Sequence, residues 1–262
     1  MCASKITNIP YGTRSIVRTV QLVKLVAERG QIGWRLTDLA TQCGLGKSTV
    51  FRILSCLTAQ RMIRQRTTDR RYVAGPLLYE LSLALPMHSG FKDVVHAHLE
   101  DIARRIKAVA FLHLLAGDEV ICIDRAGTTT TQPLTGIGTR RPILQSTFGI
   151  SMLLAMSPSR QREMLSAEVK GAGKRSVAYR RILNRSKQYG YGVHIDDVLP
   201  GLTISVPILE KSGEPIASIG ITMADSKAPE SRIKSVAEFL QDRARRIEKE
   251  NSDLIAELRG RS

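Results

Sequence analysis

The sequence predicts an α+β protein of two domains, and three observations lead to that prediction. Residues 1–75 carry 13 basic and 3 acidic side chains, a net charge of +10 out of +15 for the whole chain. The same part has the pattern of three helices followed by one short strand pair. The remainder alternates amphipathic helices with apolar runs separated by glycine-containing turns, which is typical of antiparallel strands.

Length and composition exclude several classes of protein. The chain has 262 residues, of which 43% are hydrophobic and 24% charged, as in ordinary folded domains. No apolar run approaches the roughly 20 residues that a membrane span needs, and residues 1–10 lack the apolar core of a signal peptide. The four cysteines are scattered and form no CxxC pair. We therefore expect a cytoplasmic protein with free thiols, without a cofactor or bound metal, that does not associate with membranes.

The basic N-terminal part is predicted to begin with a loose tail over residues 1–13. Apolar residues at helical spacing then predict a helix over residues 14–29, which Gly30 ends. Thr37, followed by an acidic residue, is the expected N-cap of a short helix that ends near Gly44. A third helix is expected over residues 47–60.

A hairpin and a linker are predicted to follow. The polar segment 67–70 separates two short β-like runs within residues 62–74, and Pro76 suits the first turn of another helix that ends before Pro86. Residues 86–90 have the composition of a hinge. The expected domains are therefore a basic N-terminal domain at 14–75, a linker helix and hinge at 76–90, and a second domain at 91–262.

The second domain is predicted to begin with an amphipathic helix over residues 91–107. Two hairpins are expected, one turning at residues 116–118 and one between the strands 203–210 and 216–223. Helices are expected over the segments 149–156, 159–169 and 175–188, and a single helix from Glu230 to Leu258 closes the chain.

The segment Leu36–Leu57 has the pattern of a helix-turn-helix. Ala40 is small enough for close helix packing, and Gly44 can adopt the positive φ of the turn without steric cost. Four apolar residues are expected to form the seam between the two helices: Leu39, Leu45, Val50 and Ile53. A compact, strongly basic segment of this kind indicates a nucleic-acid partner, double-stranded DNA.

The polar side chains of this region are assigned two roles. Residues expected on base edges in the major groove are Ser48, Thr49 and Arg52. Residues expected on the phosphate backbone are Lys47 and the wing arginines Arg64, Arg66, Arg70 and Arg71. Thr37, at the start of the preceding helix, is also expected to contact DNA. Phe51 has three possible roles: contact with a thymine methyl, contact with the sugar-phosphate, or inward packing.

At this point the chain resembles the IclR family of bacterial transcription factors. The resemblance spans residues 14–250 and rests on SIVRTVQLVKLVAERG, LTDLATQCGLGKSTVFRIL and RYVAGPLLYELSLAL in the first part. In the second part, RRPILQSTFGISMLLAMSP and QYGYGVHIDDVLPGLTISVPI are similar to the family's two characteristic segments. It implies a winged helix-turn-helix domain and a GAF-like effector-binding domain. It further implies homodimers or homotetramers on a near-palindromic operator, a small-molecule effector such as an aromatic or other carboxylate, and action as repressor or activator through RNA polymerase.

The same resemblance assigns an effector site. Its expected residues are Ser146, Thr147, Phe148, Gly149, His194, Asp197, Ile204, Ser205, Gly220 and Thr222. Phe148 and Ile150 stand where the family often has small or polar residues, and Gly220 and Thr222 where serine is common. We therefore expect an effector less polar than a small keto acid, or impaired sensing. The alternative is that Phe148 and Ile150 are plain core residues.

Two functions of other classes stay open from the sequence. One is a basic DNA-binding protein that senses no ligand and has weak sequence preference. The other is an enzyme fused to a DNA-binding domain, although His194 near Asp197 is accompanied by no nucleophile or phosphate-binding motif. His96 and His98 lie two residues apart on a predicted helix, so they do not form a metal-ligand pair. Arg243, Arg245 and Arg246 are expected on a solvated helix face.

Overall fold

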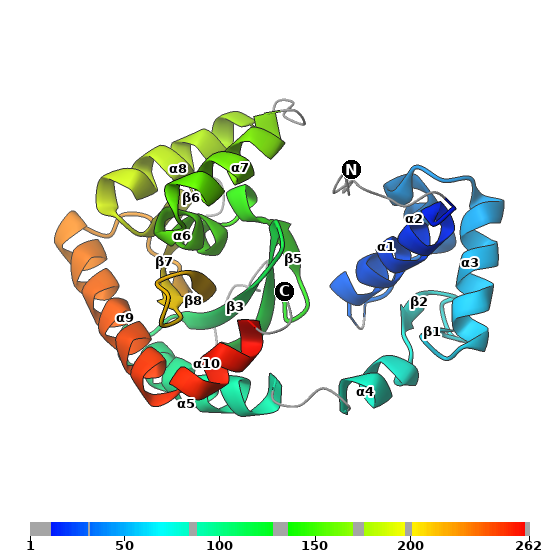
Figure 1. Ribbon diagram of the computed structural model, residues 1–262, viewed down its shortest axis with the longest axis horizontal. Coiled ribbons are helices and arrows are strands. Elements are labelled where there is room, and N and C mark those ends of the chain that lie inside the picture. Colours follow the sequence, from blue (N-terminus) through cyan, green and yellow to red (C-terminus); the bar gives the residue numbers. More distant parts are fainter. Residues whose placement is uncertain are drawn as a thin grey trace. The chain divides into compact units, whose positions relative to one another are not determined.

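The computed structural model describes residues 12–30, 32–83, 88–127, 136–169, 176–196 and 201–259. The chain divides into two compact units, Met1–Pro86 and Met87–Ser262 (Figure 1). Each unit has its own buried core and is described by itself. The expected tail at 1–13 lies outside the described residues except for its last two positions, and no helix in the described ranges is long and apolar enough to cross a membrane.

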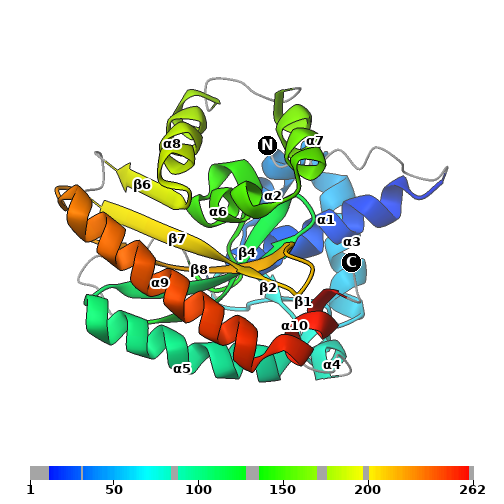
Figure 2. The same ribbon diagram turned by 60° about the vertical axis from the view of Figure 1, so that its left-hand side comes forward.

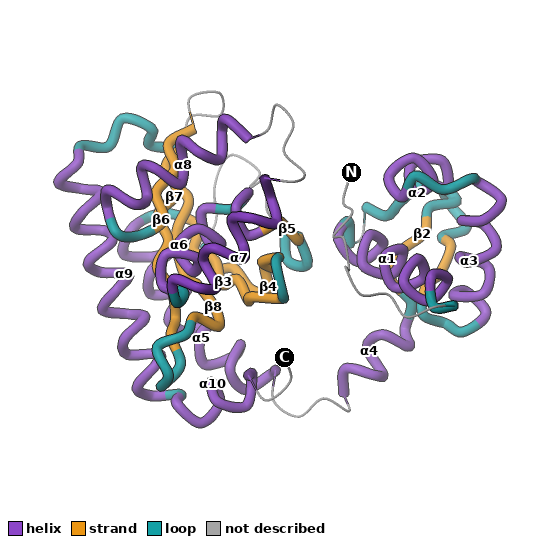
Figure 3. The backbone as a smooth tube through the Cα atoms, turned by 45° about the horizontal axis from the view of Figure 1, so that its top comes forward, coloured by secondary structure: helices purple, strands orange, loops and turns teal. Residues whose placement is uncertain are grey.

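The first unit is a winged helix-turn-helix, as predicted. Its elements are α1 (Arg14–Glu28), α2 (Leu36–Cys43), α3 (Lys47–Ala59), β1 (Ile63–Gln65), β2 (Tyr72–Ala74) and α4 (Pro76–Leu83). The strands β1 and β2 pair antiparallel to form the wing. Figure 3 shows α1, α2 and α3 gathered beside this hairpin.

The core of the first unit forms where α1, α2 and α3 meet. Leu39 and Val50 of the predicted seam are fully buried, whereas Leu45 and Ile53 are only partly buried at its margin. Leu54 and Leu57 occupy the deeper positions instead, because residues four and seven positions after Val50 share its helix face. The helix-turn-helix prediction is thus confirmed, with Leu54 and Leu57 taking the buried positions on α3 that were expected for Ile53.

The turn between α2 and α3 depends on Gly44. Its φ of 64° lies in the left-handed region, and its N–H bonds to the carbonyls at the end of α2. The expected N-cap at Thr37 is wrong: α2 begins at Leu36, and Arg35 occupies the N-cap position without a side-chain hydrogen bond to the helix. The reason is the backbone bridge between Trp34 and Tyr72, which keeps the chain extended up to Arg35, so the helix starts immediately afterwards.

The second unit combines one antiparallel sheet with helices on both faces. Its elements are α5 (His88–Ile106), β3 (Val109–Ala116), β4 (Glu119–Ala126), β5 (Arg140–Pro142), η1 (Ile143–Gln145), α6 (Thr147–Ala155), α7 (Pro158–Val169), α8 (Ser176–Tyr189), β6 (Gly192–Asp196), β7 (Gly201–Leu209), β8 (Pro215–Met223), α9 (Glu230–Glu250) and α10 (Ser252–Arg259). The strand order is β5-β4-β3-β8-β7-β6. Every neighbouring pair is antiparallel, which confirms the α+β prediction.

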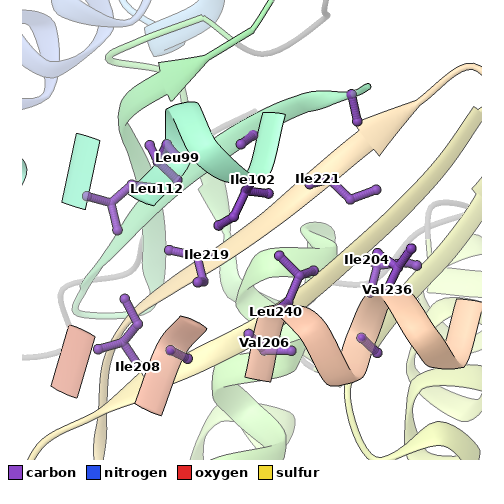
Figure 4. Close-up of a cluster of buried hydrophobic side chains, with 14 of the residues drawn as sticks. Leu99, Ile102, Leu112, Ile204, Val206, Ile208, Ile219, Ile221, Val236 and Leu240 are labelled. Carbon is purple, nitrogen blue, oxygen red and sulfur yellow. The ribbon is translucent and has the colours of Figure 1, made fainter. Parts of the chain in front are cut away.

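The two faces of this sheet are covered differently. Helices α5 and α9 cover one face, and α6 and α8 contact the other (Figure 2). The main core lies under α5 and α9, where Leu99 and Leu240 pack on Ile204, Ile219 and Ile221 of the central strands (Figure 4). Because side chains alternate along a strand, the residues between these isoleucines point to the α6 face.

Three expectations about the second unit are wrong. Helix α5 begins at His88, so residues 88–90 belong to a helix and not to a hinge, and residues 86–87 lie outside the described ranges. The last helix is broken at Asn251, whose side-chain Nδ2 donates to the carbonyl of Ile247 at 3.0 Å and so ends α9. Arg243 does not lie on a solvated face, because its guanidinium pairs with Asp101 of α5 at 2.6 Å.

Candidate nucleic-acid interface and ligand site

Helix α3 presents a polar, cationic face to solvent. Lys47, Ser48 and Arg52 are exposed and Thr49 is half-buried, because the buried positions of this helix lie on the opposite side. Arg52 forms no ion pair within the described ranges, so its charge is free to meet an external anion. Phe51 is 52% exposed, which excludes inward packing and leaves the two external roles.

Two of the four wing arginines form hydrogen bonds and ion pairs within the first unit. Arg66 bonds to both carboxylate oxygens of Asp69, at 3.1 and 2.6 Å, and donates to the carbonyl of Ile32 at 3.0 Å. Arg71 donates to the carbonyls of Ile32 and Gly33 and lies 3.6 Å from the same carboxylate. The hydrogen bonds from Arg66, with a smaller contribution from Arg71, lower the pKa of Asp69. The bonds to Ile32 and Gly33 join the wing to the segment before α2. Arg66 and Arg71 therefore shape the wing.

The other two wing arginines point outward. Arg64 of β1 and Arg70 at the turn are exposed, and neither forms an ion pair in the part of the chain that the structure describes. Arg70 has a φ of 60°, and its carbonyl accepts a hydrogen bond from the side chain of Gln65 at 2.9 Å. Together with Lys47 and Arg52, these side chains give the first unit a cationic surface suited to phosphate groups.

The second candidate site is the sheet face beneath the start of α6. Ser205 donates from Oγ to the carbonyl of Thr147 at 2.9 Å, which fixes the helix on β7. Gly220 on β8 lies under the ring of Phe148, because a Cβ at Gly220 would be 2.8 Å from Cε1 of that ring. Beside them, the hydroxyls of Thr203 and Thr222 are 3.0 Å apart. The sequence assignment thus brings Thr147, Phe148, Ser205, Gly220 and Thr222 onto one face.

Phe148 fills the middle of this face with an aromatic cluster. Its ring stacks on the imidazole of His113, with centroids 4.0 Å apart, and meets the ring of Phe111 edge-on. Burial, aided by the positive charge of Arg141, lowers the pKa of His113 to about 3, so the imidazole is neutral. Ile150, two positions further along α6, is fully buried. This packing is compatible with the alternative that Phe148 and Ile150 are plain core residues. The sheet face beneath α6 is mainly apolar.

Not every assigned residue belongs to this site. Ile204 is wrong, because it points to the opposite face and packs under α9 (Figure 4). Gly149 is buried against the backbone of Ile143, where a Cβ would be 2.1 Å from the carbonyl oxygen, so its role is close packing. Ser146 is the buried N-cap residue of α6, and His194 of β6 is half-buried opposite Thr203. Asp197 lies outside the described residues.

Three residues of this face were missed by sequence reasoning. His113, Thr203 and Ser218 have no assigned role in the motifs, yet the sheet register places them on the α6 face. Residues two positions away from Phe111, Ser205 and Gly220 share their face, so strict alternation along β3, β7 and β8 was the signal that would have found them.

Two family models together cover most of the chain. Residues 87–249 match the model described as "Bacterial transcriptional regulator IclR C-terminal", and residues 15–67 match the IclR helix-turn-helix domain. The first of these covers the segment in which a fused enzyme would have its catalytic domain, so that alternative is wrong.

Curated relatives and solved structures agree with these matches. The chain is 22% identical over 245 residues to the transcriptional regulator KdgR of Escherichia coli, covering 91% of this chain and 92% of KdgR. It is 27% identical over 224 residues to the probable transcriptional regulator SauR of Cupriavidus necator, covering 80% and 86%. Among structures, an IclR regulator from Alicyclobacillus acidocaldarius has a TM-score of 0.67 at 21% identity, covering 94% of this chain and 99% of that one.

A further solved structure resembles the whole fold. An IclR homolog from Microbacterium hydrocarbonoxydans, complexed with 4-hydroxybenzoate, has a TM-score of 0.66 at 22% identity and covers 92% of this chain and 99% of that one. The family models, the relatives and the fold lead to the same assignment. The chain belongs to the IclR family and is a bacterial transcriptional regulator.

Proposed function

We propose that α3 enters the DNA major groove and reads an operator. Ser48, Thr49 and Arg52 contact base edges, whereas Lys47, Arg64 and Arg70 contact phosphates. The observation that carries this assignment is the exposed, unpaired cationic face of α3 and the wing, set against two wing arginines that are engaged internally. Two copies of the chain read the two halves of a near-palindromic operator.

The proposed regulator acts in the cytoplasm as a homodimer or homotetramer. A small molecule binds the second unit and changes operator affinity or recruitment of RNA polymerase, because it binds two conformational states with different affinity. The matched relatives support this scheme, since KdgR is named as a transcriptional regulator and aligns with 91% of this chain and 92% of its own length.

The proposed effector is less polar than a small keto acid. Phe148 and the neutral His113 make the α6 face apolar, with the hydroxyls of Thr203 and Thr222 at its margin. A planar aromatic molecule with one polar group suits such a surface. The 4-hydroxybenzoate bound by the homolog from Microbacterium hydrocarbonoxydans supports an aromatic effector class.

The first experiment is selection of bound duplexes from a random DNA pool at low and near-physiological salt. We expect a palindrome that survives the higher salt, because base contacts add affinity that salt does not remove. Recovery of unrelated sequences, lost steeply as salt rises, supports the ligand-independent, weakly specific DNA-binding protein instead.

The role of Arg52 is tested on the recovered duplex. Arg52→Ala is expected to weaken binding to the operator by about 10-fold or more while changing binding to unrelated DNA little, since a bidentate base contact contributes about 1–3 kcal/mol of discrimination. Lys47→Ala is the matched comparison and is expected to weaken both equally. Equal losses for Arg52→Ala assign Arg52 to the phosphates.

The effector class is tested by a thermal-shift screen of metabolites. Aromatic compounds are expected to raise the melting temperature of the protein, and Phe148→Ala is expected to change which of them bind. A screen in which only small dicarboxylates raise the melting temperature contradicts the apolar-effector proposal.

A further inference from the structure

A groove of about 370 Å³ lies between α1 and α3 in the first unit. Its walls carry polar side chains from both helices, with Arg18 and Thr19 on α1 and Thr49 and Arg52 on α3. Ile53 and Leu57 contribute its apolar part. Two of these residues, Thr49 and Arg52, are also the ones assigned to base edges, so the groove continues the DNA-reading surface of α3 toward α1.

This groove carries positive charge. Arg18 and Arg52 are both exposed, and neither forms an ion pair with an acidic side chain in the described ranges. The like charges of two guanidinium groups on one groove favour a negatively charged occupant. Arg18 can make a charge-assisted contact with it, while Arg52 keeps its role at base edges. The Thr49 hydroxyl can donate to the same anion, whereas the Thr19 hydroxyl donates to the carbonyl of Ser15 at 2.8 Å.

We propose that this groove holds a phosphate of the DNA backbone, with Arg18 as the contact that α1 contributes. The inference rests on the proposed docking of α3 in the major groove. That groove is about 12 Å wide. A helix with its side chains is about 10–12 Å across, so an element packed beside α3 lies over a phosphate strand and not over bases. Arg18 therefore positions the unit on DNA and carries no sequence preference of its own.

A second copy of the chain is the competing occupant. Ile16 and Val20 on α1 are 62% and 49% exposed, which would suit a contact between copies. A two-fold contact centred on the groove, however, brings the same patch of both copies together and so opposes Arg18 and Arg52 to their own equivalents. The like charges favour a polyanion in the groove.

The test measures affinity for DNA as a function of salt. Wild type, Arg18→Ala and Lys24→Ala are compared on the selected duplex and on a random-sequence duplex. Lys24 is an exposed cation of α1 that does not line the groove, so it is the matched control. Loss of one phosphate contact is expected to reduce the slope of log K against log salt by about 0.9 on both duplexes for Arg18→Ala. Lys24→Ala is expected to leave the slope unchanged.

The outcomes separate this inference from the proposed function. If wild type prefers the operator but Arg18→Ala behaves like Lys24→Ala, the phosphate site is wrong and the proposed function stands. If wild type binds neither duplex, both fail. A change in operator sequence preference for Arg18→Ala also overturns the inference, because it assigns Arg18 to bases.

The alkylation rate of Cys56 reports directly whether the same groove is occupied. Its thiol is exposed and lines the groove near Arg52, so a bound phosphate strand is expected to slow its alkylation several-fold. The rate is followed by mass spectrometry of the peptide that contains Cys56, with and without DNA, and Arg18→Ala is expected to reduce the protection. Protection that grows with protein concentration and needs no DNA assigns the groove to a contact between copies.

Discussion

The imidazole of His113 is neutral because it is buried. The free energy of unfolding therefore depends on pH through this residue. Its pKa of about 3 lies below the ordinary value of 6.5 because the ring is desolvated under Phe148 and faces the charge of Arg141. Between these two pH values the unfolded chain binds a proton at this site that the folded chain does not bind. The folded state therefore loses stability as the pH falls through 6.5 and continues to lose it down to about 3.

The size of this loss can be measured with one variant. Lowering the pH from 7 to 5 is expected to remove about 2 kcal/mol of the free energy of unfolding through His113, at about 1.4 kcal/mol for each pH unit below its unfolded pKa. His113→Phe keeps a ring against Phe148 and removes the titrating group, so its pH-dependent loss is expected to be smaller by that amount. Urea unfolding of both proteins at the two pH values checks this, and identical losses contradict it.

For single residues, the sequence predicted the backbone conformation and side-chain size that a position needs better than it predicted which side chains and carbonyls interact. Gly44 and Ala40 were identified because their roles follow from local geometry, a positive φ and a small side chain. The hydrogen bonds that join Arg66 and Arg71 to the carbonyl of Ile32 span 34 and 39 positions, and no local sequence pattern predicts such distant partners. For the same reason, Asp101 was not recognised as the partner of Arg243.

Helices α5 and α9 are joined by that ion pair, whose two side chains are largely buried. Asp101 also accepts hydrogen bonds from Arg104 and Arg105, and these contacts lower the pKa of its carboxyl. Arg243 lies against the ring of Phe239, 5.1 Å from its centroid, and so fills space between the helices. The pair therefore sets how α9 lies against α5 on the sheet.

Breaking this contact is expected to destabilise the second unit. Arg243→Met is expected to lower the free energy of unfolding several-fold more than the matched control, although Asp101 keeps its two other arginines. Arg246→Met is the matched control on the same helix, since Arg246 is exposed and pairs only with Asp242 one turn away. Its expected cost is below about 0.5 kcal/mol. If denaturant unfolding gives equal losses of unfolding free energy for the two variants, the ion pair between α5 and α9 stabilises the second unit no more than an exposed ion pair does.

Among the strands of the second unit, the long ones were predicted and the short ones were not. The hairpins β3–β4 and β7–β8 were recognised because eight or nine residues of apolar pattern surround a glycine turn. β5 has three residues and β6 has five, too few for a pattern to emerge from the flanking sequence. The break at Asn251 was missed because the apolar spacing continues across it, whereas the break depends on a side-chain hydrogen bond.

The whole molecule contains separate cores in its two units. One buried cluster lies in the first unit and three lie in the second, and within the described residues each is confined to one unit. The resemblance in sequence was sufficient to predict this division and the family. It was less informative about the ligand face, where Ile204 and Ser205 are neighbours in sequence but point to opposite sides of the sheet.

Separate cores imply that each ligand stabilises its own unit. Calorimetry of the full chain is expected to show two transitions, and a fragment of residues 87–262 is expected to reproduce one of them. DNA at about 100 times its Kd should add about 2.7 kcal/mol to the transition that the fragment lacks. An aromatic effector should raise the transition that the fragment retains, in the fragment as in the full chain. A single transition in the full chain, together with a fragment that is unfolded, would mean that the second unit needs the first to fold. An effector that raises the melting temperature of the DNA-sensitive transition alone would place its binding site in the first unit.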